Sequence, residues 1–194
     1  MEMVAEVNRL YYAAVKTYWL FLLASLLVIG SACTKAPPAE PELAKTATIK
    51  EIMDSMVDPS GEFLFESVQE ISDEHGVSEK APQTEEEWSE VRHRAVTLLE
   101  APNLLVMPGR RVAQANEKPE RQEIELAPER IQQLIDGDRV SFINRAKDLQ
   151  GAAAMALKAI DARDKKGLVD ALTVLDKACE NCHLQYWYPP RKKS

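Results

Sequence analysis

The sequence contains few cysteines, glycines and histidines, and each shortage narrows the class of protein it encodes. It has three Cys, seven Gly and three His in 194 residues. Three thiols are an odd number for a disulfide framework, and no glycine-rich loop that could cradle a phosphate is present. The net charge is −7 and basic residues cluster only at the last few positions, so the charge pattern of a nucleic-acid-binding protein is missing.

The longest uncharged stretch lies near the N-terminus, between Lys16 and Lys35, and ends in Gly30-Ser-Ala-Cys33. An apolar segment followed by small residues and a cysteine resembles a bacterial lipoprotein signal, in which Cys33 becomes the first residue and carries lipid. The segment is also long enough to remain as an uncleaved membrane anchor, and secretion without lipid is a third alternative. All three predict that the rest of the chain lies on the periplasmic side of the membrane.

Composition divides the chain into segments. We expect residues 1–33 to be a signal or anchor and residues 34–45 to be a semi-extended tether, since this stretch is rich in Pro and poor in apolar side chains. Residues 46–190 are expected to form the folded domain, and residues 191–194 a basic tail. The lipid or the anchor would then tether the domain to the membrane.

A C-x-x-C-H motif, Cys179-Glu-Asn-Cys182-His183, lies near the other end of the chain. This is the attachment motif for a c-type haem. On a helix, residues at i, i+3 and i+4 share one face, so both thiols can reach the haem vinyl groups while the imidazole of His183 meets the iron. The motif predicts one covalent haem c, with two thioether bonds and His183 as an axial ligand.

Other roles for a C-x-x-C pair fit this context less well. A thioredoxin-like pair begins a helix, whose N-terminal dipole lowers the pKa of the first thiol, whereas the apolar spacing here runs directly into Cys179 and indicates that the pair ends a helix. A zinc site needs a fourth ligand, and the sequence offers none nearby. A simple disulfide between Cys179 and Cys182 would leave His183 without a role.

Hydrophobic spacing predicts an all-α domain, because no convincing alternating segment or hairpin turn stands out. The expected helices cover Thr46–Val57 with a restart after Asp58-Pro59-Ser60 through Ile71, Thr84 to Pro102, Pro128 to Ile160, and Gly167 to Tyr186, and a charged loop covers residues 108–125. Thr84 and Glu87 form a capping box at the second helix. Each helix carries an apolar stripe, which predicts an antiparallel four-helix bundle with the haem at one end of its core.

Alanines are unusually dense in the third expected helix, between Ala152 and Ala159. Such small side chains allow either close packing between helices or space for a porphyrin.

With C-x-x-C-H in the last helix of such a bundle, the chain resembles class II c-type cytochromes, the cytochrome c prime family. The resemblance covers roughly Thr46 to Tyr188, and C-x-x-C-H is its specific motif. Family members often continue as C-H-x-x-aromatic-basic; Tyr186 matches the aromatic residue, but Trp187 stands where the basic residue is expected. The resemblance implies haem c, His183 as fifth ligand and, in many members, a homodimer.

The resemblance also implies that a residue of the first helix faces the sixth position of the iron. That residue is Met in six-coordinate electron-transfer members and an apolar blocker in five-coordinate, gas-binding members. Met53 is the candidate sixth ligand and Met56 a weaker one, while both could instead fill the core as flexible apolar side chains. Methionine favours ferrous iron and raises the potential, which suits an electron carrier.

The sequence thus predicts a monohaem cytochrome that carries single electrons to and from other redox proteins and is not an enzyme. A five-coordinate protein that binds NO or CO is the alternative, and a haem-free helical interaction lipoprotein is a third hypothesis.

Overall fold

The computed structural model describes residues 9, 15–16, 43–73 and 76–188. Its contacts divide the chain into a unit that ends at Leu43 and a second unit that begins at Ala44. Cys33, most of the expected leader and the basic tail lie outside the described residues, so the following account concerns the second unit. In the described ranges, no helix has both the length and the apolar character that crossing a membrane requires.

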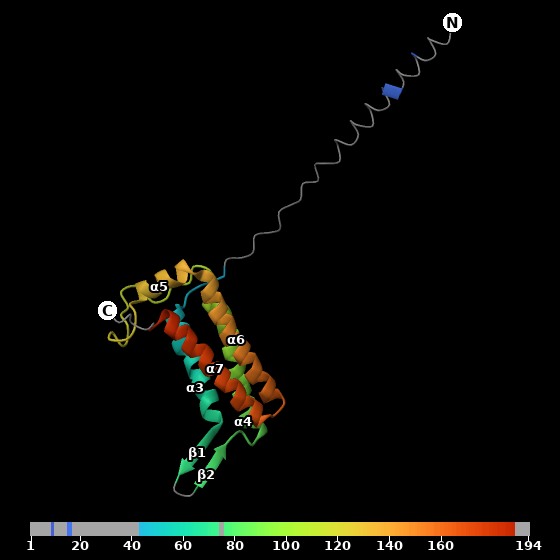
Figure 1. Cartoon of the computed structure of the whole chain (residues 1–194), viewed down its shortest axis with the longest axis vertical. Coiled ribbons are helices and arrows are strands. Elements are labelled where there is room, and N and C mark those ends of the chain that lie inside the picture. Colours follow the sequence, from blue (N-terminus) through green and yellow to red (C-terminus); the bar gives the residue numbers. More distant parts are fainter. Residues whose placement is uncertain (1–8, 10–14, 17–42, 74–75, 189–194) are drawn as a thin grey trace. The chain divides into compact units, whose positions relative to one another are not determined.

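The second unit is mostly helical, which confirms the predicted helical class (Figure 1). Its helical elements are α2 (Ile49–Ile52), the π-helix η1 (Met53–Val57), α3 (Asp58–Ser67), α4 (Glu85–Leu105), α5 (Pro128–Gly137), α6 (Arg139–Asp161) and α7 (Lys165–Tyr186). A two-stranded antiparallel hairpin, β1 (Gln69–Asp73) and β2 (Gly76–Lys80), connects α3 to α4.

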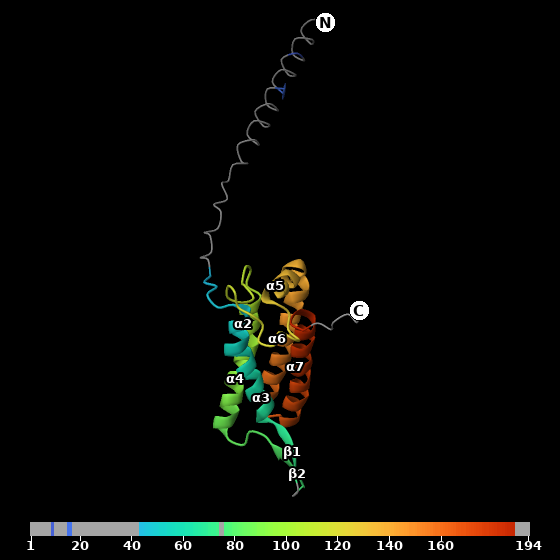
Figure 2. The same cartoon turned by 90° about the vertical axis from the view of Figure 1, so that its left-hand side faces the viewer.

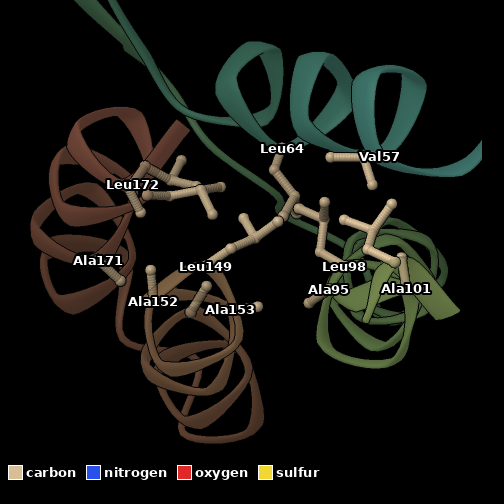
Figure 3. Close-up of a cluster of buried hydrophobic side chains, with 14 of the residues drawn as sticks. Val57, Leu64, Ala95, Leu98, Ala101, Leu149, Ala152, Ala153, Ala171 and Leu172 are labelled. Atoms are coloured by element: carbon tan, nitrogen blue, oxygen red, sulfur yellow. The ribbon is translucent and has the colours of Figure 1, made fainter. Parts of the chain in front are cut away.

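Helices α3, α4, α6 and α7 lie side by side in both views of the molecule (Figures 1 and 2). Helix α6 packs against α7 and α4, and α3 packs against α4. Figure 3 shows one leucine from each of these helices pointing toward a shared interior. These leucines are Leu64, Leu98, Leu149 and Leu172, and none is more than 7% exposed.

The alanines of α6 serve close packing between helices. Ala152, Ala153, Ala156 and Ala159 are buried, and Ala152 lies beside Ala171 of α7 (Figure 3). Small side chains let the two backbones approach closely, and none of these alanines lines the candidate site described below. Of the two roles that the sequence allowed, the structure confirms packing.

The predicted break at Asp58-Pro59-Ser60 is wrong, because helical structure continues from Ile49 to Ser67. A proline inside an α-helix clashes with the carbonyl group four residues earlier, which here belongs to Ser55. The wider turn of η1 precedes Pro59, and its backbone is held by a hydrogen bond from the Asp58 N–H to the Met53 carbonyl. The π-helix thus accommodates the proline without ending the helix.

The predicted helix from Pro128 to Ile160 is also wrong, since it is two helices that meet at Asp138. The backbone of Asp138 leaves the helical region, and its side chain accepts a hydrogen bond from the Ser141 N–H at 3.0 Å. Aspartate is a favoured N-cap residue, and it follows Gly137, a weak helix former. The cap therefore begins a new helix, α6, where hydrophobic spacing alone predicted continuity.

Two smaller boundaries differ from expectation. Residues Gln69–Asp73 form strand β1 and not the end of the first helix, and Gly76, at a φ of 123°, begins β2 in a backbone region that favours glycine. Helix α4 continues past Pro102 to Leu105; this proline lies in the last turn and is buried, so packing offsets its missing N–H.

The N-terminus of α4 provides a test of the helix assignment. Thr84 accepts from the Glu87 N–H, and the Glu87 carboxylate accepts from the Thr84 N–H at 3.0 Å, so both parts of the predicted capping box are present. Because Thr84→Ala removes one of them, we expect the free energy of unfolding to fall by about 1 kcal/mol, measured by urea denaturation at neutral pH. Thr173→Ala, at an exposed position within α7, is the control and should change it by less than about 0.5 kcal/mol. Equal effects of the two variants would contradict the capping role.

Candidate functional site

A pocket of about 240 Å³, open to solvent on one side, lies where α2 and α6 begin and where α4 and α7 end. This is the end of the helices opposite the hairpin (Figures 1 and 2). Side chains from each of these helices and from the loop before α5 line it, and most of its wall is apolar. Its apolar lining includes Ile49, Val57, Leu105, Phe142, Ala146, Leu149 and Ala178.

Helix α7 brings the three residues of the C-x-x-C-H motif to this pocket. Cys179, Cys182 and His183 all line it, and each is half-buried. The motif lies in the last two turns of α7, as the sequence predicted. The preceding buried residues Leu175 and Ala178 anchor the same helix in the core, so the three side chains extend from a rigid support.

The two candidate methionines take different positions. Met53 is half-buried and lines the pocket from η1. It therefore belongs to a different wall from the motif, which lies on α7. Met56 packs against the hydrophobic core and does not line the pocket. The structure therefore brings Met53 to the same cavity as His183 and separates Met56 from it.

The loop between α4 and α5 forms a further wall of the pocket. Its carbonyls at Arg111 and Val112 accept hydrogen bonds from the N–H groups of Ile49 and Lys50, each at 2.9 Å. Its other end is fixed where the Leu126 N–H donates to the carbonyl of Trp187 at 2.8 Å. The loop thus joins the start of α2 to the end of α7 across the pocket.

Side chains of this loop complete the wall. Glu120, Arg121 and Glu125 line the pocket, and Lys50 of α2 forms ion pairs with Glu117 at 2.8 Å and with Glu120 at 3.1 Å. Because Lys50 bonds to both carboxylates, they hold its pKa above the usual range. These ion pairs link the loop to the helix that carries Met53.

Burial controls the protonation of the motif's side chains. It raises the pKa of both Cys179 and Cys182 to about 11, with smaller contributions from nearby negative charges, so both are neutral thiols. Burial also lowers the pKa of His183, although the Asp58 carboxylate partly opposes this effect. A neutral imidazole is the form that binds a metal, whereas a redox-active dithiol of the thioredoxin type needs a lowered thiol pKa.

Two aromatic residues after the motif, Trp187 and Tyr188, lie against the ring of His183. The ring of Tyr188 lies 5.6 Å from that of His183 between centroids, and the ring of Trp187 lies 6.4 Å away. The Tyr188 hydroxyl is 3.2 Å from His183 Nδ1 and 3.1 Å from a carboxylate oxygen of Glu180. Tyr186, which matched the family pattern, is instead buried edge-to-face against Phe142.

Arg145 is a residue that sequence reasoning missed. It lines the pocket from α6, and one of its terminal nitrogens pairs with Asp148 at 3.0 Å. Its Nε is buried and has no hydrogen-bond partner among the described residues. The signal was present in the sequence, since Arg145 shares the helical face of Phe142 and Leu149, where a polar group without a hydrogen-bond partner is costly.

The donor set fits a haem better than a metal ion held by protein side chains alone. In the part of the chain that the structure describes, no group of three or more His, Cys, Asp or Glu side chains could hold a metal ion. A haem iron takes four ligands from the porphyrin and needs only an axial one from the protein. The pocket offers an imidazole for the iron, two neutral thiols, an apolar wall and a guanidinium whose buried Nε has no hydrogen-bond partner among the described residues.

Comparisons with known proteins do not identify a family for this chain: no family model, no curated protein and no solved structure matches it.

The raised thiol pKa values lead to a test on the full chain made without haem. With a pKa of about 11, roughly one thiol in a thousand is ionised at pH 8. In a Cys33→Ala background, we expect Cys179 and Cys182 to react with iodoacetamide about 100-fold more slowly than free cysteine, because only the thiolate is the nucleophile. The same sample unfolded in urea is the control and should react at the free rate. Fast reaction in the folded chain below pH 8 would support a thioredoxin-like pair.

Proposed function

We propose that this chain is a monohaem c-type cytochrome of the class II kind that carries single electrons. The observation that supports this most strongly is that Cys179, Cys182 and His183 line one pocket together with Met53, although about 125 residues separate Met53 from the motif. Helices α3, α4, α6 and α7, with the pocket at one end, are consistent with an antiparallel four-helix bundle.

The residues of the pocket have distinct roles in this proposal. The sulfur of each of Cys179 and Cys182 adds to one carbon of a haem vinyl group, and the thiol proton goes to the other carbon. His183 and Met53 would each supply a ligand to the haem iron. Haem held by these residues would supply a one-electron couple between ferrous and ferric iron.

Arg145 gives the proposal an electrostatic basis. Its buried Nε has no hydrogen-bond partner in the part of the chain that the structure describes, and a haem carries two propionate groups that can accept hydrogen bonds from a guanidinium. The cavity is somewhat smaller than the roughly 300–1,000 Å³ of most small-molecule sites, so part of the haem would lie in the solvent-facing opening. An exposed haem edge suits electron exchange with other redox proteins.

The N-terminal apolar segment and Cys33 support a cellular location for the proposed function. Cys33, as a lipid carrier, or the apolar segment before it, as an anchor, would tether the domain to the periplasmic side of the membrane, where haem is attached to c-type cytochromes. The partners would then be redox proteins of the periplasm or the membrane, and a homodimer is consistent with the resemblance.

Covalent attachment is tested on the full chain produced in a host that matures c-type cytochromes. We expect haem that acidified organic solvent does not extract, because two thioether bonds hold it. The double variant Cys179→Ala, Cys182→Ala should lose all covalent haem, whereas the control Cys33→Ala should retain it. Extractable haem or no haem in the parent chain would contradict the proposal.

The role of Met53 is tested by absorption spectra of the ferrous protein with and without carbon monoxide. We expect the parent protein to be low-spin and insensitive to carbon monoxide, and Met53→Ala to become high-spin and bind it, because the sixth position is then open. Met56→Ala, whose side chain packs in the core, is the matched control and should remain low-spin. A parent protein that is high-spin and binds carbon monoxide would support the gas-binding alternative instead.

A further inference from the structure

The end of α7 turns back so that Tyr188 covers the imidazole of His183. The backbone N–H groups of Trp187 and Tyr188 both donate to the carbonyl of His183, at 2.8 and 2.9 Å. This tight turn places the Tyr188 hydroxyl 3.2 Å from Nδ1 of His183 and 3.1 Å from a carboxylate oxygen of Glu180. Three side chains within nine residues of sequence therefore form one connected chain of hydrogen bonds.

The chemistry of the three groups fixes the direction of these hydrogen bonds. An ionised carboxylate can only accept, so the Tyr188 hydroxyl donates its proton toward Glu180. Its oxygen is then left to accept from an N–H of His183, which places the imidazole proton on Nδ1. The lone pair of Nε2 is consequently the one available to a metal.

Histidines that bind metals commonly donate their other ring N–H to a carboxylate or carbonyl oxygen, which fixes the tautomer and raises the basicity of the ligand. We propose that Tyr188 and Glu180 are positioning residues that present Nε2 of His183 to the haem iron and lower the reduction potential of that iron. This inference rests on the proposed function, since it assigns residues to the same site. A more basic imidazole stabilises ferric iron more than ferrous iron.

The replacement Tyr188→Phe tests the inference, because it keeps the ring over His183 and removes only the hydroxyl. In the haem-loaded full chain, we expect the ratio of reduced to oxidised protein at a fixed applied potential to rise about tenfold. This corresponds to an increase of about 59 mV in the reduction potential for one electron. Glu180→Gln leaves an oxygen that can accept from Tyr188 but removes its charge, so a smaller shift in the same direction is expected. An unchanged potential in Tyr188→Phe would overturn the inference.

Asp176→Asn is the matched control for charge. Asp176 lies one helical turn before Glu180 and is exposed, so its replacement removes a carboxylate from the same helix without touching Tyr188. We expect its effect on the potential to be clearly smaller than that of Glu180→Gln. Equal shifts would mean that Glu180 acts only through its charge, and would overturn its role in the hydrogen-bonded chain.

A second measurement separates this inference from the proposed function. Nitrogen-15 NMR of the full chain made without haem should show His183 protonated on Nδ1, and Tyr188→Phe should shift the tautomer toward Nε2. A parent chain with the proton on Nε2 would overturn the inference whether or not haem binds. If the tautomer is as expected but no covalent haem is found after maturation, the proposed function fails, whereas the hydrogen bonds that join Glu180, Tyr188 and His183 are still supported.

Discussion

The helical spacing of Cys179, Cys182 and His183 is the constraint on which the candidate site depends. These side chains share one face only while α7 stays helical to its end, so the last turns of α7 must be held firmly. Close packing against the alanines of α6 holds the body of the helix, and buried Tyr186 holds its end. The dense alanines therefore support the site without lining it.

The loop before α5 is a structural part of the site, although its composition resembles that of an exposed connection. It bonds to the first N–H groups of α2 at one end and to the carbonyl of Trp187 at the other. Buried Arg110 reinforces it by donating to the carbonyls of Leu104 and Ala47. In this way the loop fixes the separation between the wall that carries Met53 and the wall that carries His183.

Hydrophobic spacing predicted the helical class, whereas local signals in the sequence predicted individual features more accurately. The capping box at Thr84 and the helical C-x-x-C-H motif were predicted correctly because each depends on residues a few positions apart. Spacing did not reveal the cap at Asp138 or the π-helix before Pro59, since both are backbone adjustments within otherwise continuous apolar stripes. The contact of Tyr188 with His183 depends on a turn after α7 that no periodicity describes.

In the proposed cytochrome, the two walls of the pocket would act on the iron in opposite directions. A thioether ligand from Met53 favours the ferrous state, whereas a basic imidazole supported by Tyr188 and Glu180 favours the ferric state. The Asp58 carboxylate, whose charge is felt by His183, would add to the second effect. The potential would then depend on how the loop holds the two walls, which connects the packing of the helices to the direction of electron transfer.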